Sequence, residues 1–274
     1  MTPPNPLPPE AHLGRVRLRV ADLQRCVEFY SDVLGFSVVA DDGGTAVLGT
    51  GDGQALLMLH SAPGAERAPP GTTGLFHMAF QLPDRRELGA MIRRVRDQGH
   101  SFEGFADHNV SEAAYLPDPE GNGIELYADR APEVWRSVEG SMYMTTEPLD
   151  VQGLVDAAPR SAPELPARTR LGHIHLRVST LEAAEAFYVE RLGMHVTTRR
   201  YPGALFFAAG DYHHHVGANV WGGVGAPRPP AGCLGLLSFE IVIADPEARK
   251  VLLGEADVGV LHDLDDVGVR IVAR

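Results

Sequence analysis

Two histidines and one glutamate stand on short apolar segments of this sequence, where they could hold a metal ion. His77 lies in the middle of GLFHMAF, His173 lies in LGHIHLRV, and Glu125 lies in GIELY. Glu125 is flanked by two apolar residues, so in a strand its side chain would face the side opposite to theirs. Two imidazoles and one carboxylate on one face form a facial triad, which leaves coordination positions open for a substrate and O2 and suits non-heme Fe(II).

Each of these residues has a plainer explanation when it is taken alone. A single histidine on an apolar strand is more often a packed core residue than a ligand, and Glu125 could be a surface residue on a terminal strand. The metal hypothesis therefore depends on whether the elements of the fold bring His77, Glu125 and His173 together.

An internal repeat indicates how those elements are organised. The segment LGRVRLRVADLQRCVEFYSDVLGFSV (13–38) aligns without a gap with LGHIHLRVSTLEAAEAFYVERLGMHV (171–196). Leucine, glycine, phenylalanine and tyrosine positions of the first segment recur in the second at a constant offset. Agreement of this extent is not expected by chance, so the chain contains at least two copies of one structural unit.

Each copy is predicted to form a strand, a helix and further strands. In the first copy, VRLRV alternates apolar and polar residues, as a half-buried strand does. Leu23, Val27, Tyr30 and Leu34 then recur at three- and four-residue steps, which places them on one helix face, and Gly35 would end that helix. TAVLGTG and QALLMLHS are interpreted as strands separated by glycine turns.

Two weaker copies complete the pattern. One opens with GLFHMAFQL, continues with a helix from about Arg86 to Arg96 and closes with GIELYAD, while the other opens with GLLSFEIVI and is short. We therefore predict an α+β fold of four βαβββ modules. Prolines divide the chain between its halves, so an N-terminal domain is expected at 11–130, a linker at 131–169 and a C-terminal domain at 170–274.

The composition argues against several classes of protein. The 274 residues are 44% hydrophobic and 22% charged, which is typical of a globular protein with a packed core. A net charge of −12 without any Lys/Arg run argues against nucleic acid or an anionic membrane as a partner. Cys26 and Cys233 form no CxxC pair and fit a reducing compartment. Without a signal-peptide pattern or an apolar run of membrane-spanning length, we expect a cytoplasmic protein.

The four-module order, with LxxxxxFYxxxLG after the first strand, resembles the vicinal oxygen chelate superfamily. That superfamily includes glyoxalases, bleomycin-resistance proteins and extradiol dioxygenases. The resemblance covers the chain apart from its proline-rich N-terminal tail and the central linker. It implies that modules pair, that their sheets curl around a cleft, and that a divalent metal binds in that cleft.

The resemblance also implies where the ligands of such a metal would lie. In chain order the first-strand slot holds Arg15, His77, His173 and Ser238, and the closing-strand slot holds Glu125 in module two and Arg270 in module four. An arginine cannot bind a cation and a serine is a poor ligand, so modules two and three carry the whole set. These modules belong to different halves, so they would pair within one chain or across a dimer. A homo-oligomer is expected from the habit of the superfamily.

Within the superfamily, three segments resemble the two-domain catechol 2,3-dioxygenases: GLFHMAF, SEAAYLPDPEGNGIELYADR and GDYHHHVGANVW. The resemblance implies catalytic roles for Tyr115, ten residues before the ligand glutamate, and for His108 upstream of that tyrosine. It also implies that His214 is the distal acid–base, with His213 and His215 facing the other side of a regular strand.

The reaction that this resemblance implies is Fe(II)-dependent extradiol cleavage of a catechol-type diol by O2, as in aromatic hydrocarbon catabolism. The diol would chelate the metal and yield a ring-opened semialdehyde. His214 would take the second phenol proton, since histidine titrates near neutral pH. Tyr115 would donate a hydrogen bond and His108 would hold the substrate oxygens, while His175 would either line the pocket or pack in the core.

Three alternatives stay open. A glyoxalase-like isomerase or metal-dependent transferase usually has a second carboxylate, which has no obvious occupant here. A non-catalytic binding protein of the bleomycin-resistance kind usually lacks the triad, so metal content would distinguish it. The third alternative keeps the triad but binds Mn(II) and opens a hydroquinone ring, because the ligand set suits both metals.

Overall fold

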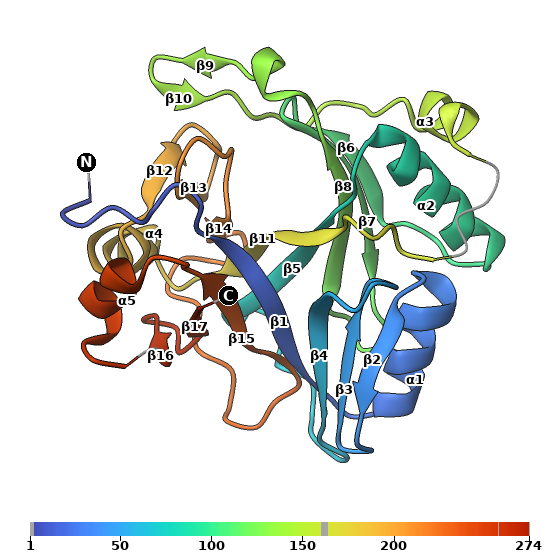
Figure 1. Ribbon diagram of the computed structural model, residues 1–274, viewed down its shortest axis with the longest axis horizontal. Coiled ribbons are helices and arrows are strands. Elements are labelled where there is room, and N and C mark those ends of the chain that lie inside the picture. Colours follow the sequence, from blue (N-terminus) through green and yellow to red (C-terminus); the bar gives the residue numbers. More distant parts are fainter. Residues whose placement is uncertain (1–2, 160–163, 257, 274) are drawn as a thin grey trace.

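The computed structural model describes residues 3–159, 164–256 and 258–273, and these fold into two mixed β-sheets with helices packed on their outer sides (Figure 1). The first sheet has seven strands and the second has eight. Both are curved, and the four modules pair to build them. The α+β architecture predicted from the repeat is therefore confirmed. None of the described helices is long and apolar enough to span a membrane.

The first half of the chain contains modules one and two. Module one comprises β1 (His12–Val20), α1 (Leu23–Glu28) with a π-helical continuation (Phe29–Val33), β2 (Ser37–Asp41), β3 (Thr45–Gly49) and β4 (Ala55–Ser61). Module two comprises β5 (Gly74–Gln81), α2 (Arg85–Asp97), β6 (Gly104–Asp107), β7 (Ser111–Pro117) and β8 (Gly123–Asp129). The helix of module two agrees with its predicted extent.

The second half repeats the pattern with a shorter last module. Module three comprises β11 (Arg170–Arg177), α4 (Leu181–Glu185) with a π-helical continuation (Ala186–Arg191), β12 (His195–Thr198), β13 (Ala204–Ala208) and β14 (Val216–Asn219). Module four comprises β15 (Gly235–Val242), α5 (Pro246–Leu253), β16 (Gly259–His262) and β17 (Gly268–Val272). Its described part has one strand fewer than a βαβββ module.

The sheets do not follow the two halves of the sequence. The first sheet has the order β16-β17-β15-β1-β4-β3-β2, so it joins modules one and four. The second has the order β12-β13-β14-β11-β5-β8-β7-β6, so it joins modules two and three. The segments expected as domains at 11–130 and 170–274 therefore each contribute to both sheets. Sequence proximity favoured pairing within a half, whereas the antiparallel pairs β1–β15 and β11–β5 join the halves.

The segment between the halves has structure of its own. It contains a short 3-10 turn (Pro132–Val134), a hairpin of β9 (Ser137–Val138) and β10 (Ser141–Met142), and α3 (Val151–Ala157). Figure 1 shows the hairpin projecting beyond the second sheet, and α3 beside α2. Arg93 of α2 donates hydrogen bonds to the carbonyls of Val155 and Pro159 in this segment. The predicted linker is thus packed against module two.

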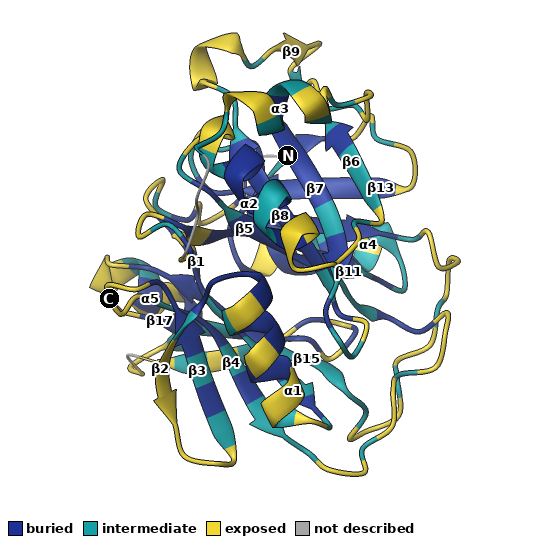
Figure 2. Cartoon of the chain, turned by 90° about the vertical axis from the view of Figure 1, so that its right-hand side faces the viewer, coloured by how far each residue is buried: buried dark blue, intermediate teal, exposed yellow. Residues whose placement is uncertain are grey.

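The hydrophobic core is built from apolar residues that alternate with polar residues along the strands. On β1, Val16, Leu18 and Val20 are fully buried, while the arginines between them are only partly buried. In Figure 2 the buried residues form continuous bands through both sheets and along the inner faces of α1 and α2. At the end of the first helix, Gly35 adopts a positive φ of 76°, as expected for the residue that terminates a helix.

Candidate metal centre and active site

Three adjacent strands at the middle of the second sheet carry the predicted ligands. His77 lies on β5, Glu125 on β8 and His173 on β11, and β5 is hydrogen-bonded to both of the other strands. In the register, Ala79 of β5 stands opposite both Glu125 and His173. Because side chains alternate along a strand, His77 then shares a sheet face with these two. Pairing of modules two and three within one chain therefore assembles the triad.

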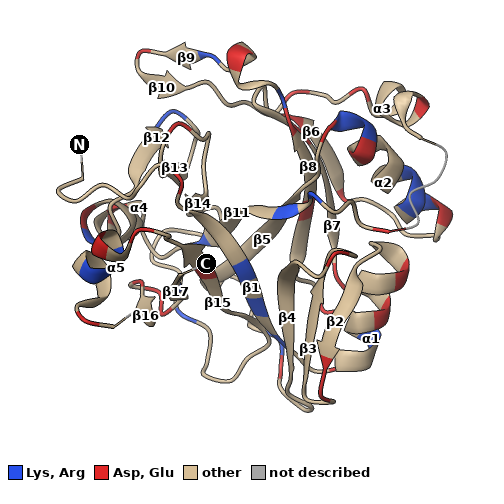
Figure 3. Ribbon diagram, viewed as in Figure 1, with Lys and Arg blue, Asp and Glu red and all other residues tan. Residues whose placement is uncertain are grey.

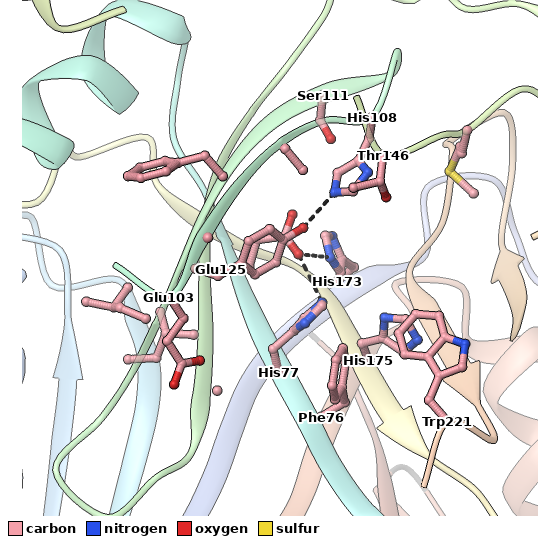
Figure 4. A pocket seen from close by; sticks show the side chains of 18 of the residues that line it. Phe76, His77, Glu103, His108, Ser111, Glu125, Thr146, His173, His175 and Trp221 are labelled. Atoms are coloured by element: carbon pink, nitrogen blue, oxygen red, sulfur yellow. Dashed lines mark hydrogen bonds and ion pairs between the residues drawn. The ribbon is translucent and has the colours of Figure 1, made fainter. Parts of the chain in front are cut away.

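The three side chains converge on one point (Figure 4). Oε2 of Glu125 lies 2.9 Å from Nε2 of His77 and 3.1 Å from Nε2 of His173. One potential ligand atom from each residue lies within 4.8 Å of the others, and all three residues are buried. Among the described residues, no other group of this kind is found.

The donor set fits a divalent transition metal. Two ligand atoms about 2.1 Å from a metal and at right angles to each other are about 3 Å apart, which matches both contacts of Glu125. Although His77 Nε2 is close to the carboxylate, it makes no well-aligned hydrogen bond among the described residues. Nε2 of His173, by contrast, is within hydrogen-bond geometry of the same oxygen. Oε2 of Glu125 thus lies close to both imidazole nitrogens, at separations that the ligands of one ion would also have.

The charges of the triad suit metal binding as well. Burial alone would raise the pKa of Glu125, but the imidazoles of His173 and His77 lower that pKa well below its ordinary value. Burial lowers the pKa of His173. The carboxylate is therefore ionised and the His173 imidazole is neutral near pH 7, which are the forms that coordinate a cation.

Tyr115 and His108 stand beside the triad as a pair. Tyr115 lies on β7 directly opposite Glu125 of β8. Its hydroxyl is 2.6 Å from Nε2 of His108, whose Nδ1 is 2.6 Å from the carbonyl oxygen of Thr145. Burial and the charge of Glu125 raise the pKa of Tyr115 well above its ordinary value, so the phenol keeps its proton.

His214 approaches the triad from the other side. Its ring centroid lies 4.2 Å from that of His173, and its Nδ1 is 2.7 Å from Nδ1 of His213. Nε2 of His213 is in turn 2.9 Å from Oδ1 of Asp129. Burial and the neighbouring imidazoles of His173 and His213 lower the pKa of His214 well below its ordinary value.

The three consecutive histidines were expected on a strand but precede β14, which begins at Val216. His214 faces the cavity that contains the triad. His215 instead lines a separate hollow together with Tyr212 and Arg170, and His213 lies against Tyr127 and Trp135.

A cavity of about 570 Å³ connects these groups. The triad, His108, Tyr115 and His214 all border it. Its remaining wall is largely apolar and comes from several elements of modules two and three, including Phe76, Phe105, Val110, Leu116, Phe206 and Trp221. An apolar cavity with a few convergent polar groups is the usual form of a small-molecule site.

Some residues of this cavity were not predicted. Met144 and Thr146 belong to the segment interpreted as a linker, yet both border the cavity, and Thr146 contacts the Tyr201 hydroxyl of module three. The sequence did not distinguish pocket lining from core packing for His175, and the structure places it at the border of the cavity. The proline content of the linker gave no indication of these contacts, because they depend on its path over the second sheet.

The equivalent face of the first sheet carries different chemistry. Arg15 stands in the slot of His173 and is ion-paired with Glu240 at 3.0 Å, and Arg17 also contacts that carboxylate. Figure 3 shows the basic positions along β1. Guanidinium groups occupy this face of the first sheet, where the second sheet has imidazoles. A guanidinium does not bind a cation, so this agrees with the expectation of one metal centre for the four modules.

Comparison with known proteins agrees with the architecture. The chain is 43% identical over 244 residues to the catechol-2,3-dioxygenase of Bacillus subtilis (strain 168), which covers 87% of this chain and 85% of that protein. It is 32% identical over 120 residues to biphenyl-2,3-diol 1,2-dioxygenase 3 of Rhodococcus globerulus, which covers 43% of this chain and 63% of that protein. A variant of glyoxalase I from Zea mays has the same fold, with a TM-score of 0.56 at 20% identity over 96% of this chain and 92% of that one.

A family model supports the same relationship over both halves of the chain. The model of the Glyoxalase/Bleomycin resistance protein/Dioxygenase superfamily matches residues 12–126 and 170–240. These matches include the first strands of modules one to three and most of the first strand of module four, and they cover the three residues of the triad. The chain therefore belongs to the glyoxalase, bleomycin resistance protein and dioxygenase superfamily.

Proposed function

We propose that this protein is an Fe(II)-dependent extradiol dioxygenase that opens the ring of a catechol-type diol with O2 to give a semialdehyde. The observation that carries the proposal is the convergence of His77, Glu125 and His173 in a cavity that also contains His214 and the Tyr115–His108 pair. Two relatives named for diol dioxygenation support it.

His77, Glu125 and His173 would hold the metal through two nitrogens and one carboxylate oxygen. Fe(II) at this position would act as a Lewis acid toward the two diol oxygens and offer a binding position for O2. The apolar wall of the cavity would pack against the aromatic ring and exclude water from it.

His214 is proposed as the base that takes a phenol proton from the bound diol. When His213 donates its Nε2–H to Asp129, its Nδ1 accepts the Nδ1–H of His214. This arrangement leaves the lone pair on Nε2 of His214 available for a proton. Asp129 and His213 would thus act as positioning residues that fix the tautomer of the base.

Tyr115 is proposed as a hydrogen-bond donor to a diol oxygen. Its raised pKa keeps the hydroxyl proton at neutral pH. Because Nδ1–H of His108 donates to the carbonyl of Thr145, Nε2 of His108 accepts the hydroxyl proton of Tyr115 in the free protein. A bound diol oxygen would take over this hydrogen bond from His108. A protonated donor here stabilises negative charge as the diol loses its protons.

The test is an anaerobic reconstitution with Fe(II), followed by catechol and air. We expect a yellow ring-opened product from the wild type and none from His77→Ala, with Mn(II) loading compared in parallel. Metal binding at one ion per chain without any ring opening would contradict the proposal and favour a metal-dependent isomerase. Absence of metal binding would indicate a binding protein.

A further inference from the structure

The cavity extends well beyond the triad along strand β11. A cavity of about 570 Å³ is in the range that holds drug-sized molecules, so a single dihydroxybenzene ring would not fill it. His173, His175 and Arg177 alternate along β11 and all three border the cavity. The proposed function uses only His173. The polar groups of the other two side chains are therefore unexplained.

His175 is a buried polar side chain without a partner. It is 4% exposed, and its Nε2 has no hydrogen-bond partner among the described residues. The ring centroid lies 5.2 Å from that of Phe76 and 5.3 Å from that of Trp221. Figure 4 shows these three side chains beside one another. Leaving a buried polar nitrogen unpaired destabilises a protein, so a ligand that bonds to it would relieve that cost.

The backbone is adapted to hold this imidazole in place. Gly217 of β14 stands directly opposite His175 in the register. A Cβ at position 217 would lie 2.9 Å from Cγ of His175, which is closer than packed atoms allow. The ring occupies the space that the glycine leaves, so it packs directly against the backbone of β14.

Arg177, two residues further along the same face, is a cation without an acidic partner. Its guanidinium lies 5.1 Å from the centre of the Phe76 ring and donates one hydrogen bond to the carbonyl of Leu75. No carboxylate pairs with it among the described residues, and burial lowers its pKa. A half-buried guanidinium with unused donors is suited to bind a carboxylate.

We propose that His175 and Arg177 form a subsite for a carboxylate carried by the aromatic diol. This inference rests on the proposed function for the identity of the ligand as a diol held at the triad, whereas the contacts to a carboxylate need only His175 and Arg177. Successive inward residues of a strand are about 6.6 Å apart, so His175 meets the beginning of a ring substituent and Arg177 its end. The substrate class is thus catechols with a short anionic side chain.

The first test compares two diols of similar shape with the Fe(II)-loaded protein. We expect kcat/KM to be roughly ten-fold or more higher for 3,4-dihydroxyphenylacetate than for 4-methylcatechol, since charge-assisted hydrogen bonds of this kind have that effect. Arg177→Met should abolish the preference mainly through KM and leave 4-methylcatechol unaffected. Arg170→Met, at the exposed end of the same strand, is the matched control and should retain the preference.

The second test measures binding without turnover. Trp221 lies at the mouth of the cavity, so its fluorescence should respond to phenylacetate but not to uncharged benzyl alcohol. The response should disappear in Arg177→Met and weaken in His175→Phe. Cleavage of 4-methylcatechol as efficient as that of the acid, with no response to phenylacetate, would overturn the subsite but leave the dioxygenase. A response to phenylacetate without cleavage of any diol would support the subsite and refute the proposed function.

Discussion

At the scale of single residues, Glu125 is the group on which the proposed centre most depends. Its Oε2 is within 3.1 Å of both histidine nitrogens, and its charge is what makes the triad attractive to a cation. Loss of an outer partner of a metal ligand costs about 10- to 100-fold in metal affinity, and loss of the ligand itself should cost more.

Glu125→Gln should therefore bind Fe(II) at least about 100-fold more weakly than the wild type. The neutral amide keeps the shape of the side chain but removes its negative charge. The measurement is metal content after anaerobic dialysis against graded Fe(II), with circular dichroism to establish that the variant is folded. Unchanged metal content in a folded Glu125→Gln variant would exclude this carboxylate as a ligand.

His214 and Asp129 should differ in the size of their effects. His214→Gln should lower kcat by about 10²- to 10⁴-fold, as loss of a general base does. Asp129→Asn should lower it less, because the base remains and only its tautomer is less well fixed. Stopped-flow measurement of diol deprotonation would compare them. Equal rates of deprotonation in the wild type and His214→Gln would assign the proton to another group.

The sequence indicated part of the cavity, but not how its residues are connected. The aligned first strands placed His77 and His173 in one slot, and the resemblance implied Glu125 as their partner and added Tyr115, His108 and His214. Nothing in the sequence indicated Met144 or Thr146. The bond between His213 and His214, and the unpaired nitrogen of His175, depend on loop conformation and on neighbours from other strands. No spacing within one segment contains that information.

At the scale of elements, the repeat produces two equivalent tyrosine–aspartate hydrogen bonds that connect one sheet to the other. The hydroxyl of Tyr30 donates to Asp118, and that of Tyr188 donates to Asp263, at 3.1 and 3.2 Å. In both cases the helix of one module binds the turn before the last strand of the next module. The tyrosine of the repeated phenylalanine–tyrosine pair thus joins module one to module two and module three to module four, and in both cases the two modules belong to different sheets.

The buried carboxyl of Asp263, which accepts the Tyr188 hydrogen bond, should make the stability of the protein depend on pH. Burial raises the pKa of Asp263 to about 6, and the charge of Asp265 contributes to the increase. The folded protein then binds this proton more tightly than the unfolded chain does. The resulting contribution to the free energy of unfolding is fully present below about pH 4, and it is lost as the pH rises through about 6. Asp263→Asn should remove that loss.

We expect Asp263→Asn to have a higher free energy of unfolding than the wild type at pH 7.5, by up to roughly 3 kcal/mol, with little difference at pH 4. An amide oxygen can still accept from the backbone N–H groups of Asp265 and Val267. Urea unfolding at both pH values provides the measurement, and Asp97→Asn, on the exposed end of α2, is the control. A variant less stable than the wild type at pH 7.5 would show that ionising the buried Asp263 carboxyl does not lower the free energy of unfolding.

The elements were largely predictable, and their pairing was predictable in part. Periodicity indicated the first strand and the helix of module one, and the repeat extended this pattern to the other modules. The shared ligand set predicted that modules two and three pair, but it did not distinguish pairing within one chain from pairing across a dimer. The sheets show the pairing within one chain, because β5 and β11 of the same chain are hydrogen-bonded.

At the scale of the whole molecule, the second sheet completes its site from a single chain. Both halves contribute ligands, and the segment between them supplies the carbonyl of Thr145 that anchors His108. Because the described residues of one chain supply every group of the proposed site, we expect the activity per chain to stay constant when the protein is diluted.

That expectation is checked by measuring turnover with a fixed diol concentration while the protein concentration is lowered over several orders of magnitude. Size-exclusion chromatography at the same concentrations would report any change in oligomeric state. A fall in activity per chain that coincides with dissociation would show that a partner contributes to the site.

The most direct measurement of the central claim is anomalous diffraction at the iron absorption edge, from crystals loaded anaerobically with Fe(II). We expect one peak per chain, about 2 to 2.3 Å from Nε2 of His77, Nε2 of His173 and a carboxylate oxygen of Glu125. A peak at any other position, or no peak in crystals of protein that cleaves catechol, would contradict the account.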